Sequence, residues 1–228
     1  MANILAIGAH PDDIEIGMGG ALRKLLREGH EVLCVDLTDG EPTPHGTREI
    51  RRKETLASNQ VLGITRRVCL DLPNRVLLDT EEARRRLAAE MRAFRPDLVF
   101  THVERDAHPD HVAAAQITRG AVLLSRIVKI DLSHEPFRPG PVFHFLCSHL
   151  RYPYQPSFVL EVSEADYLAK LEAVMQYESQ FVVNKDNARM RDFLSTRMKY
   201  FGALIRRDYG EGFLSEEPIG LKDVTALL

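Results

Sequence analysis

Short apolar runs alternate with amphipathic segments along the first half of the chain. Buried strands are predicted for four of the apolar runs: 3–9, 31–38, 67–72 and 97–102. Helices are predicted for four intervening or following segments: about 20–28, which a Gly-rich stretch introduces, then 47–62, 80–94 and 110–128. Successive strand–helix units of this length indicate an α/β, Rossmann-like fold with a mostly parallel sheet and helices on both faces.

The second half of the chain has a different pattern. Strands are predicted at 142–148 and 157–162, separated by a proline-punctuated loop at 151–156. Two helices follow, at about 164–179 and 186–206. No linker, internal repeat or low-complexity segment interrupts the sequence, so we expect one domain over residues 1–228.

Composition narrows the possible partners. Thirty Lys and Arg residues nearly balance 33 Asp and Glu residues, giving a formal charge of −3, so the chain lacks the bulk positive charge that would hold nucleic acid or anionic lipid. No apolar run approaches the roughly 20 residues of a membrane span. The chain enters its first strand directly after Met1, without a basic leader, and its three cysteines form no C-x-x-C pair. These features predict a cytoplasmic protein.

The chemically rich residues form two clusters, each placed directly after a predicted strand. The first cluster is Ala9–Glu15, with the sequence AHPDDIE, and the second is His108–His111, with the sequence HPDH. In an open α/β sheet, ligands bind at the carboxyl ends of the strands. Both clusters are therefore expected at the ligand-binding edge.

A dinucleotide site is disfavoured. It would need G-x-G-x-x-G directly after the first strand, whereas that turn begins at Gly8 and continues through Asp12 and Asp13. Two carboxylates there would repel a pyrophosphate. The later glycines, at 17, 19 and 20, come too far after the strand.

A metal site fits the same residues better. Imidazole and carboxylate ligands suit zinc or another divalent first-row metal. His10 and Asp13 can converge on one ion, and His108 or His111 is available as a third ligand. Asp12 would then lie beside the ion without ligating it, where a general base belongs.

The remaining histidine of the second cluster has a natural role in such a site. It could polarise a developing oxyanion, and Asp110 could orient this histidine and keep it protonated. A metal-binding sugar-binding protein without catalysis is the alternative, but a binding module has no need of Asp12 as a base.

The two clusters resemble the signature of the LmbE-like (PIG-L) family of metal-dependent N-acetylglucosaminyl deacetylases, which carries A-H-P-D-D-x-E and, later, H-P-D-H. Segments 46–54, 177–181 and 209–213 also look like family features. The last two resemble the subgroup of bacillithiol-biosynthesis deacetylases. Ala107 departs from that subgroup, whose members often have a basic residue before H-P-D-H.

The resemblance implies a role for each matching residue. His10, Asp13 and His111 match the zinc ligands, and Asp12 matches the general base. Three further roles are implied for His108, which would stabilise the oxyanion, for Asp110 as its partner, and for Arg51 as a substrate contact.

The implied activity is zinc-dependent removal of the acetyl group from an N-acetylglucosaminyl conjugate. N-acetylglucosaminyl-malate is the first expected substrate, and diacetylchitobiose is an alternative. The resemblance also implies a homo-oligomer, often a hexamer.

Overall fold

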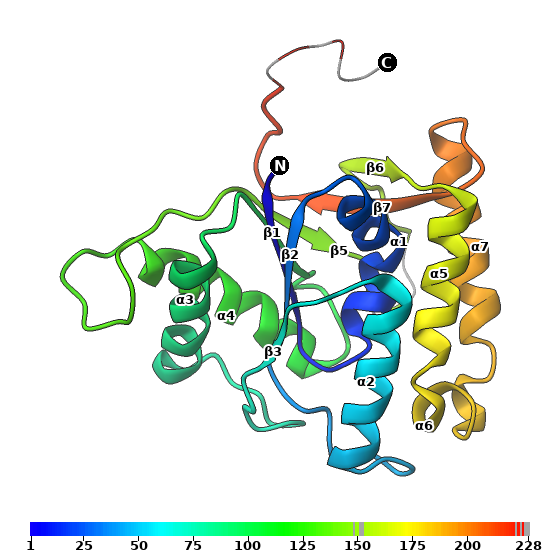
Figure 1. Cartoon of the computed structure of the whole chain (residues 1–228), viewed down its shortest axis with the longest axis horizontal. Coiled ribbons are helices and arrows are strands. Elements are labelled where there is room, and N and C mark those ends of the chain that lie inside the picture. The colour runs from blue at the N-terminus through cyan, green and yellow to red at the C-terminus, as the bar shows by residue number, and fades with distance from the viewer. Residues whose placement is uncertain (148, 151–152, 222, 224, 226–228) are drawn as a thin grey trace.

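A single seven-stranded sheet organises the chain, with the strand order β3-β2-β1-β4-β5-β7-β6 (Figure 1). The computed structural model describes residues 1–147, 149–150, 153–221, 223 and 225. Its strands are β1 (Asn3–Gly8), β2 (Glu31–Asp36), β3 (Arg67–Cys69), β4 (Leu98–His102), β5 (Val142–Phe145), β6 (Phe158–Glu161) and β7 (Gly210–Ser215). The first five strands pair in parallel, and β7 runs antiparallel to both of its neighbours. The mostly parallel, Rossmann-like sheet is confirmed.

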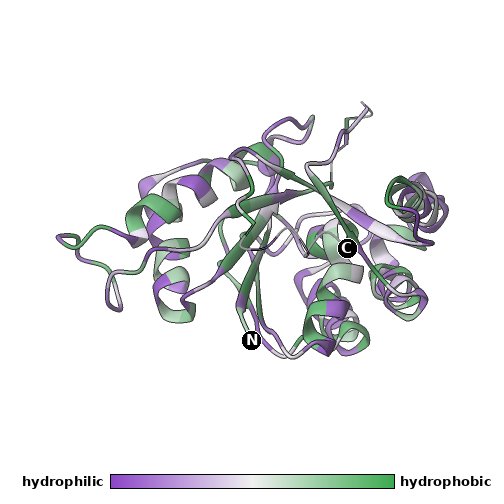
Figure 2. Ribbon diagram, turned by 90° about the horizontal axis from the view of Figure 1, so that it is seen from above, coloured by the Kyte–Doolittle hydropathy of each residue, from purple (hydrophilic) through white to green (hydrophobic). Residues whose placement is uncertain are grey.

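Helices cover both faces of the sheet (Figures 1 and 2). They are α1 (Asp13–Arg27), α2 (Arg48–Leu62), α3 (Glu81–Phe94), α4 (Pro109–Ser125), α5 (Glu164–Met175), the short α6 (Glu178–Phe181) and α7 (Met190–Leu204), with a 3₁₀ turn at Lys185–Asn187. Side chains of β1 alternate between the two faces: Ile4 and Ala6 pack on the side of α1 and α5, whereas Leu5 and Ile7 pack on the side of α3 and α4. Both faces are therefore buried, which explains the nearly continuous apolar run of this strand.

The start of α1 differs from the prediction, which placed the helix after the glycines. The helix begins at Asp13, and at Met18 the backbone leaves helical geometry (φ −146°, ψ 24°). The N–H groups of Gly20 and Ala21, just past this break, donate to the buried carboxylate of Glu211. The glycines mark close packing of the helix against its neighbours, because a Cβ at Gly17 would overlap the ring of Phe145 in β5.

Strand β7 was not predicted. Its two glycines and Glu211 give it a weak strand pattern, but it pairs with both β5 and β6, and Lys170 of α5 neutralises the buried Glu211. The predicted helix over 164–179 ends at Met175 and resumes as α6. Residues 148, 151 and 152, which belong to the predicted strand and loop of this region, lie outside the described residues.

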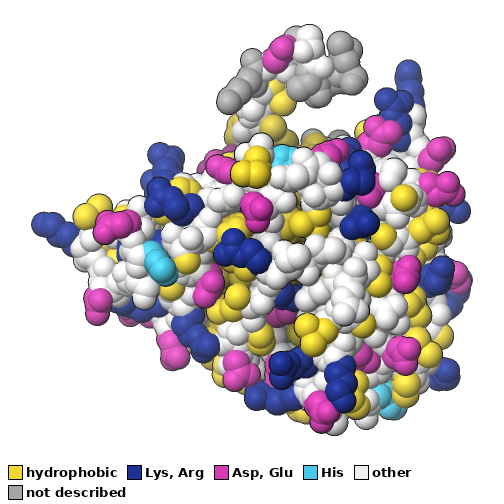
Figure 3. Space-filling model, viewed as in Figure 1, with side chains coloured by type: hydrophobic (Ala, Val, Ile, Leu, Met, Phe, Trp, Pro, Cys, Tyr) yellow, Lys and Arg dark blue, Asp and Glu magenta, His cyan; other side chains and the backbone are white. Residues whose placement is uncertain are grey.

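The surface agrees with the near balance of charge. Acidic and basic side chains intermix on the face shown in Figure 3. Within the described part of the chain, no helix combines the length and apolar character that crossing a bilayer would require.

Candidate metal centre and active site

The first cluster forms a tight turn between β1 and α1. Asp13, the first residue of α1, accepts a hydrogen bond at Oδ2 from the backbone N–H of His10 at 2.8 Å, and the same oxygen lies 3.2 Å from Nδ1 of the His10 ring. Asp12 has a φ of 104°, in the left-handed region that Asp tolerates better than most residues. The two neighbouring carboxylates have different partners: that of Asp13 faces the His10 ring, and that of Asp12 accepts from Arg51.

The second cluster reaches the same turn from the neighbouring strand. His111 lies in the first turn of α4, which follows β4, and its Nε2 lies 3.3 Å from Oδ1 of Asp13. The structure brings together His10, Asp13 and His111, and their candidate ligand atoms all lie within 4.8 Å of one another. Two imidazoles and one carboxylate are a donor set that suits a divalent metal and leaves coordination positions for water or substrate.

Two further side chains contact Asp13, and sequence reasoning gave neither a role. The Nε2 atom of His102, at the end of β4, lies 3.2 Å from Oδ2 of Asp13, and the Cys147 thiol donates to Oδ1 at 3.4 Å. His102, His111 and Cys147 form a second group of close candidate ligand atoms. The sequence signal for His102 was its place at a strand end; Cys147 carried none beyond its apolar surroundings.

The electrostatics of the turn follow from this crowding of imidazoles. Burial alone would raise the pKa of Asp13, but His111, His102 and His10 hold the pKa of this carboxyl well below its usual range. Burial likewise opposes charge on the two candidate ligand histidines. Asp13 and Asp110 nevertheless raise the pKa of His10 to about 9. Asp13 and Asp106 raise the pKa of His111 to about 10. The negative charge of Asp13 thus favours positive charge on the neighbouring His10 and His111.

Asp12 has the opposite behaviour. Burial raises its pKa to about 7, although the guanidinium of Arg51 pulls this value down. A carboxyl group with a pKa close to neutrality can both accept and return a proton near pH 7.

His108 differs from the prediction that Asp110 keeps it protonated. Burial and the charges of His111 and His10 lower the pKa of His108 to about 4, so its ring is neutral near pH 7. Its Nδ1 accepts the backbone N–H of Asp110 at 3.2 Å, which leaves a hydrogen on Nε2. The ring can therefore donate a hydrogen bond without being charged.

The Asp110 carboxylate serves another histidine. Its Oδ2 lies 3.1 Å from Nε2 of His10 and accepts the backbone N–H of Arg75 at 2.7 Å, while Oδ1 accepts that of Leu77 at 3.2 Å. The prediction paired this carboxylate with the His108 ring. Its hydrogen-bond contact is with the ring of His10, and the candidate ligand atoms of His10, His108 and Asp110 all lie within 4.8 Å of one another.

Arg51 reaches the site from α2, but it is only 3 % exposed. Its guanidinium donates to the Asp12 carboxylate at 3.2 and 3.3 Å and to the carbonyl of Pro11, and it lies 5.2 Å from the centroid of the Tyr177 ring. These contacts direct its charge to the turn that carries Asp12. Its predicted contact with substrate stays a prediction.

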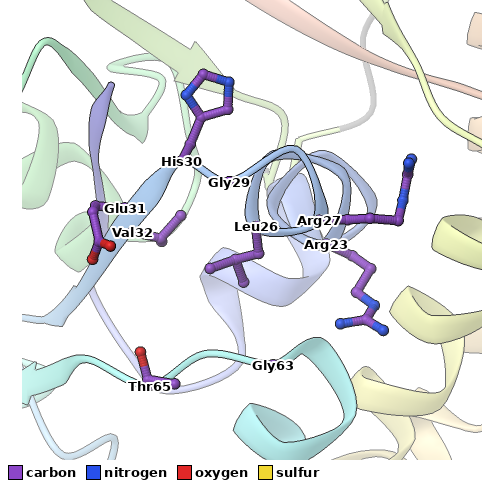
Figure 4. Close-up of a pocket in the computed structure, with 9 residues that line it drawn as sticks. All are labelled: Arg23, Leu26, Arg27, Gly29, His30, Glu31, Val32, Gly63 and Thr65. Carbon is purple, nitrogen blue, oxygen red and sulfur yellow. The ribbon is translucent and has the colours of Figure 1, made fainter. Parts of the chain in front are cut away.

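A cavity of about 380 Å³ lies elsewhere, at the amino ends of β2 and β3 (Figure 4). It is lined by the last turns of α1, the start of β2 and the loops that follow α1 and α2. Of its two arginines, Arg23 donates to the carbonyl of Leu62 and Arg27 pairs with Asp166. None of the groups of candidate metal ligands found among the described residues lies at this cavity.

Comparison with known proteins matches this arrangement to a family. The family model of the GlcNAc-PI de-N-acetylases, PIG-L, matches residues 5–122, which contain both clusters. The chain belongs to the PIG-L family. This membership confirms the resemblance drawn from the two motifs and the expectation of a deacetylase.

Individual relatives align with most of this PIG-L chain. A diacetylchitobiose deacetylase of Thermococcus kodakarensis is 28% identical over 224 residues, covering 92% of this chain and 81% of its own. A conserved protein of Thermus thermophilus has a TM-score of 0.88 and 36% identity, covering 97% of each chain. The N,N'-diacetylchitobiose deacetylase of Pyrococcus horikoshii has a TM-score of 0.80 and 29% identity, covering 93% of this chain and 82% of its own.

Proposed function

We propose that this PIG-L family protein is a zinc-dependent deacetylase that hydrolyses the acetamide of an N-acetylglucosaminyl conjugate. The observation that carries the proposal is the meeting of His10, Asp13 and His111 around one point, with Asp12 next to them and its pKa raised to about 7. Imidazole and carboxylate donors favour zinc, although iron, cobalt or manganese would accept the same set.

A divalent ion held by these three residues would supply Lewis-acid activation of a water molecule and of the acetyl carbonyl. Asp12 accepts the proton of the attacking water. The neutral His108 donates a hydrogen bond from Nε2 to the carbonyl oxygen as it gains negative charge. The oxygen of the deprotonated water bonds to the acetyl carbon. Asp12 then returns its proton to the leaving nitrogen as the C–N bond breaks, so the products are acetic acid and the amine, which become acetate and a protonated amine near pH 7.

The identity of the conjugate rests on different observations. Two of the relatives are deacetylases of diacetylchitobiose, and both align with most of this chain. The malate conjugate drew its support partly from Arg51, whose guanidinium is taken up by Asp12 and Pro11. We therefore place diacetylchitobiose first and N-acetylglucosaminyl-malate second.

Acetate release from the two conjugates and from free N-acetylglucosamine tests the proposal, with zinc restored after chelation. We expect zinc-dependent turnover, fastest with diacetylchitobiose. Exclusive turnover of the malate conjugate would reverse the order of substrates, and zinc-loaded protein that releases acetate from none of them would contradict the function.

Asp12→Asn is the variant that tests the base. Asn tolerates the left-handed backbone, and general acid–base catalysis is worth roughly 10²–10⁴-fold in rate, so turnover should fall by about this factor while zinc remains bound. Asp71→Asn is the matched control, since Asp71 is an exposed aspartate that also has a positive φ, of 49°. Near-full turnover by Asp12→Asn would show that another residue is the general base.

We further propose that the protein works as a homo-oligomer, as the family resemblance implies, and in the cytoplasm, as its composition and its start without a basic leader predict. Light scattering on the purified protein measures the subunit number directly.

A further inference from the structure

One more buried carboxylate, that of Asp106, lies beside the candidate metal centre. Asp106 belongs to the loop between β4 and α4, and its side chain is 0 % exposed. Its Oδ2 lies 2.8 Å from Nδ1 of His111. Its Oδ1 accepts the backbone N–H groups of His108 and His149, both at 3.0 Å.

The two oxygens of Asp106 thus do different work. Oδ1 braces the loop, which any acceptor of the right size could do. Oδ2 faces the ring of His111, and an anionic acceptor at this position favours a hydrogen on Nδ1. In the neutral ring that binds a metal, Nε2 then carries the free lone pair, and this is the atom that faces Asp13 at 3.3 Å.

We propose that Asp106 is a positioning residue that fixes the His111 ring for metal ligation through Nε2. The inference rests on the proposed metal centre. The carboxylate sets both the rotation of the ring and the nitrogen that carries the hydrogen, and its negative charge makes the imidazole a stronger donor to a cation. Asp106 itself touches neither the ion nor the substrate.

The other candidate histidine ligand has an equivalent arrangement. His10 lies between Asp13, on the side of Nδ1, and Asp110, on the side of Nε2. Each histidine of the centre is therefore held between Asp13 and a carboxylate of its own. Because α4 and the loop before it supply both outer carboxylates, one short segment orients the ligand His111 of α4 and the ligand His10 of the turn after β1.

Zinc affinity of Asp106→Asn tests the inference. The amide can still accept the two backbone N–H groups through its oxygen, but its NH₂ group then faces Nδ1 of His111 and favours a hydrogen on Nε2. Competition with a chromogenic chelator should show a zinc dissociation constant raised roughly 10–100-fold, the usual effect of losing an outer carboxylate.

Glu104→Gln is the matched control. It makes the same chemical change two residues earlier in the loop, where Glu104 pairs with Arg119 instead of a histidine. We expect its zinc affinity to stay at the wild-type value. Equal affinities for wild type and a folded Asp106→Asn would overturn the inference, whatever the deacetylase activity of the wild type.

A measurement on the zinc-loaded wild type covers the case in which the variant does not fold. In spectra of protein labelled with ¹⁵N at histidine, His111 should have a protonated Nδ1 and a metal-bound Nε2. Ligation through Nδ1 would refute the role of Asp106. Zinc binding through Nε2 without acetate release from any substrate would instead refute the proposed function and leave this role standing.

Discussion

The guanidinium of Arg51 lies 3.2 Å from the carboxylate of Asp12, with both groups largely buried. Its positive charge lowers a pKa that burial would otherwise raise further. Replacing Arg51 with Gln should therefore raise the Asp12 pKa, so that the basic form is reached only at higher pH. We expect the acid limb of the kcat/KM profile of Arg51→Gln to move to higher pH.

The pH profile also separates this role from the predicted substrate contact. Arg52→Gln, which removes an exposed arginine from the same helix, should leave the acid limb in place. If Arg51→Gln instead raised KM for the malate conjugate alone and left the acid limb unmoved, Arg51 would be a substrate-binding residue.

The meeting of His10 and Asp13 with the second cluster was predictable because the two clusters follow strands that pair side by side in a parallel sheet. The choice of His111 over His108 as the third ligand came from the family resemblance. The parallel order itself came from the strand–helix alternation. The partner of Asp110 was not predictable in the same way. Which ring a carboxylate meets depends on the relative rotation of two loops, and no residue pattern within either loop encodes that rotation.

Features that depend on the second half of the sheet were also hidden. Strand β7 is held by its pairing with β5 and β6. The carboxylate of Glu211 can be buried there because Lys170 pairs with it and a backbone N–H of α1 donates to it. Cys147 approaches Asp13 from the segment after β5. Such contacts join residues far apart in the sequence, whereas hydrophobic periodicity reports only on neighbours.

Gly17→Ala should destabilise the fold. Its new methyl group would overlap the ring of Phe145, which is fully buried and has little freedom to move. Overpacking of this kind costs about 1–3 kcal/mol in the free energy of unfolding, which urea denaturation would measure. Adding Phe145→Leu should recover part of the loss in a double-mutant cycle. Purely additive effects would show that the glycine serves the backbone of α1 instead.

Asp166 should stabilise α5 in a pH-dependent manner. Burial opposes its charge, but hydrogen bonds from Ser163 and Arg27 hold its pKa below the usual value. Its contribution is therefore complete above the unfolded-state pKa and is lost as pH falls through the folded-state pKa. Asp166→Asn should cost about 1 kcal/mol in the free energy of unfolding at pH 7, and less in acid.

The matched control for this helix is Glu164→Gln, an exposed acidic residue in the same first turn. We expect it to change the free energy of unfolding by less than Asp166→Asn at neutral pH. A loss for Asp166→Asn that persisted undiminished in strong acid would mean that shape rather than charge determines the effect.

Zinc should stabilise the folded protein independently of any substrate. A ligand that binds only the folded state adds about 2.7 kcal/mol to the free energy of unfolding when its free concentration is about 100 times its dissociation constant. Thermal unfolding of chelator-treated protein should therefore shift to higher temperature when zinc is added. His111→Ala should lose the shift, because it removes a ligand, whereas Asp12→Asn should keep it. A shift lost in Asp12→Asn but kept in His111→Ala would exchange the roles of base and ligand that we assign to these residues.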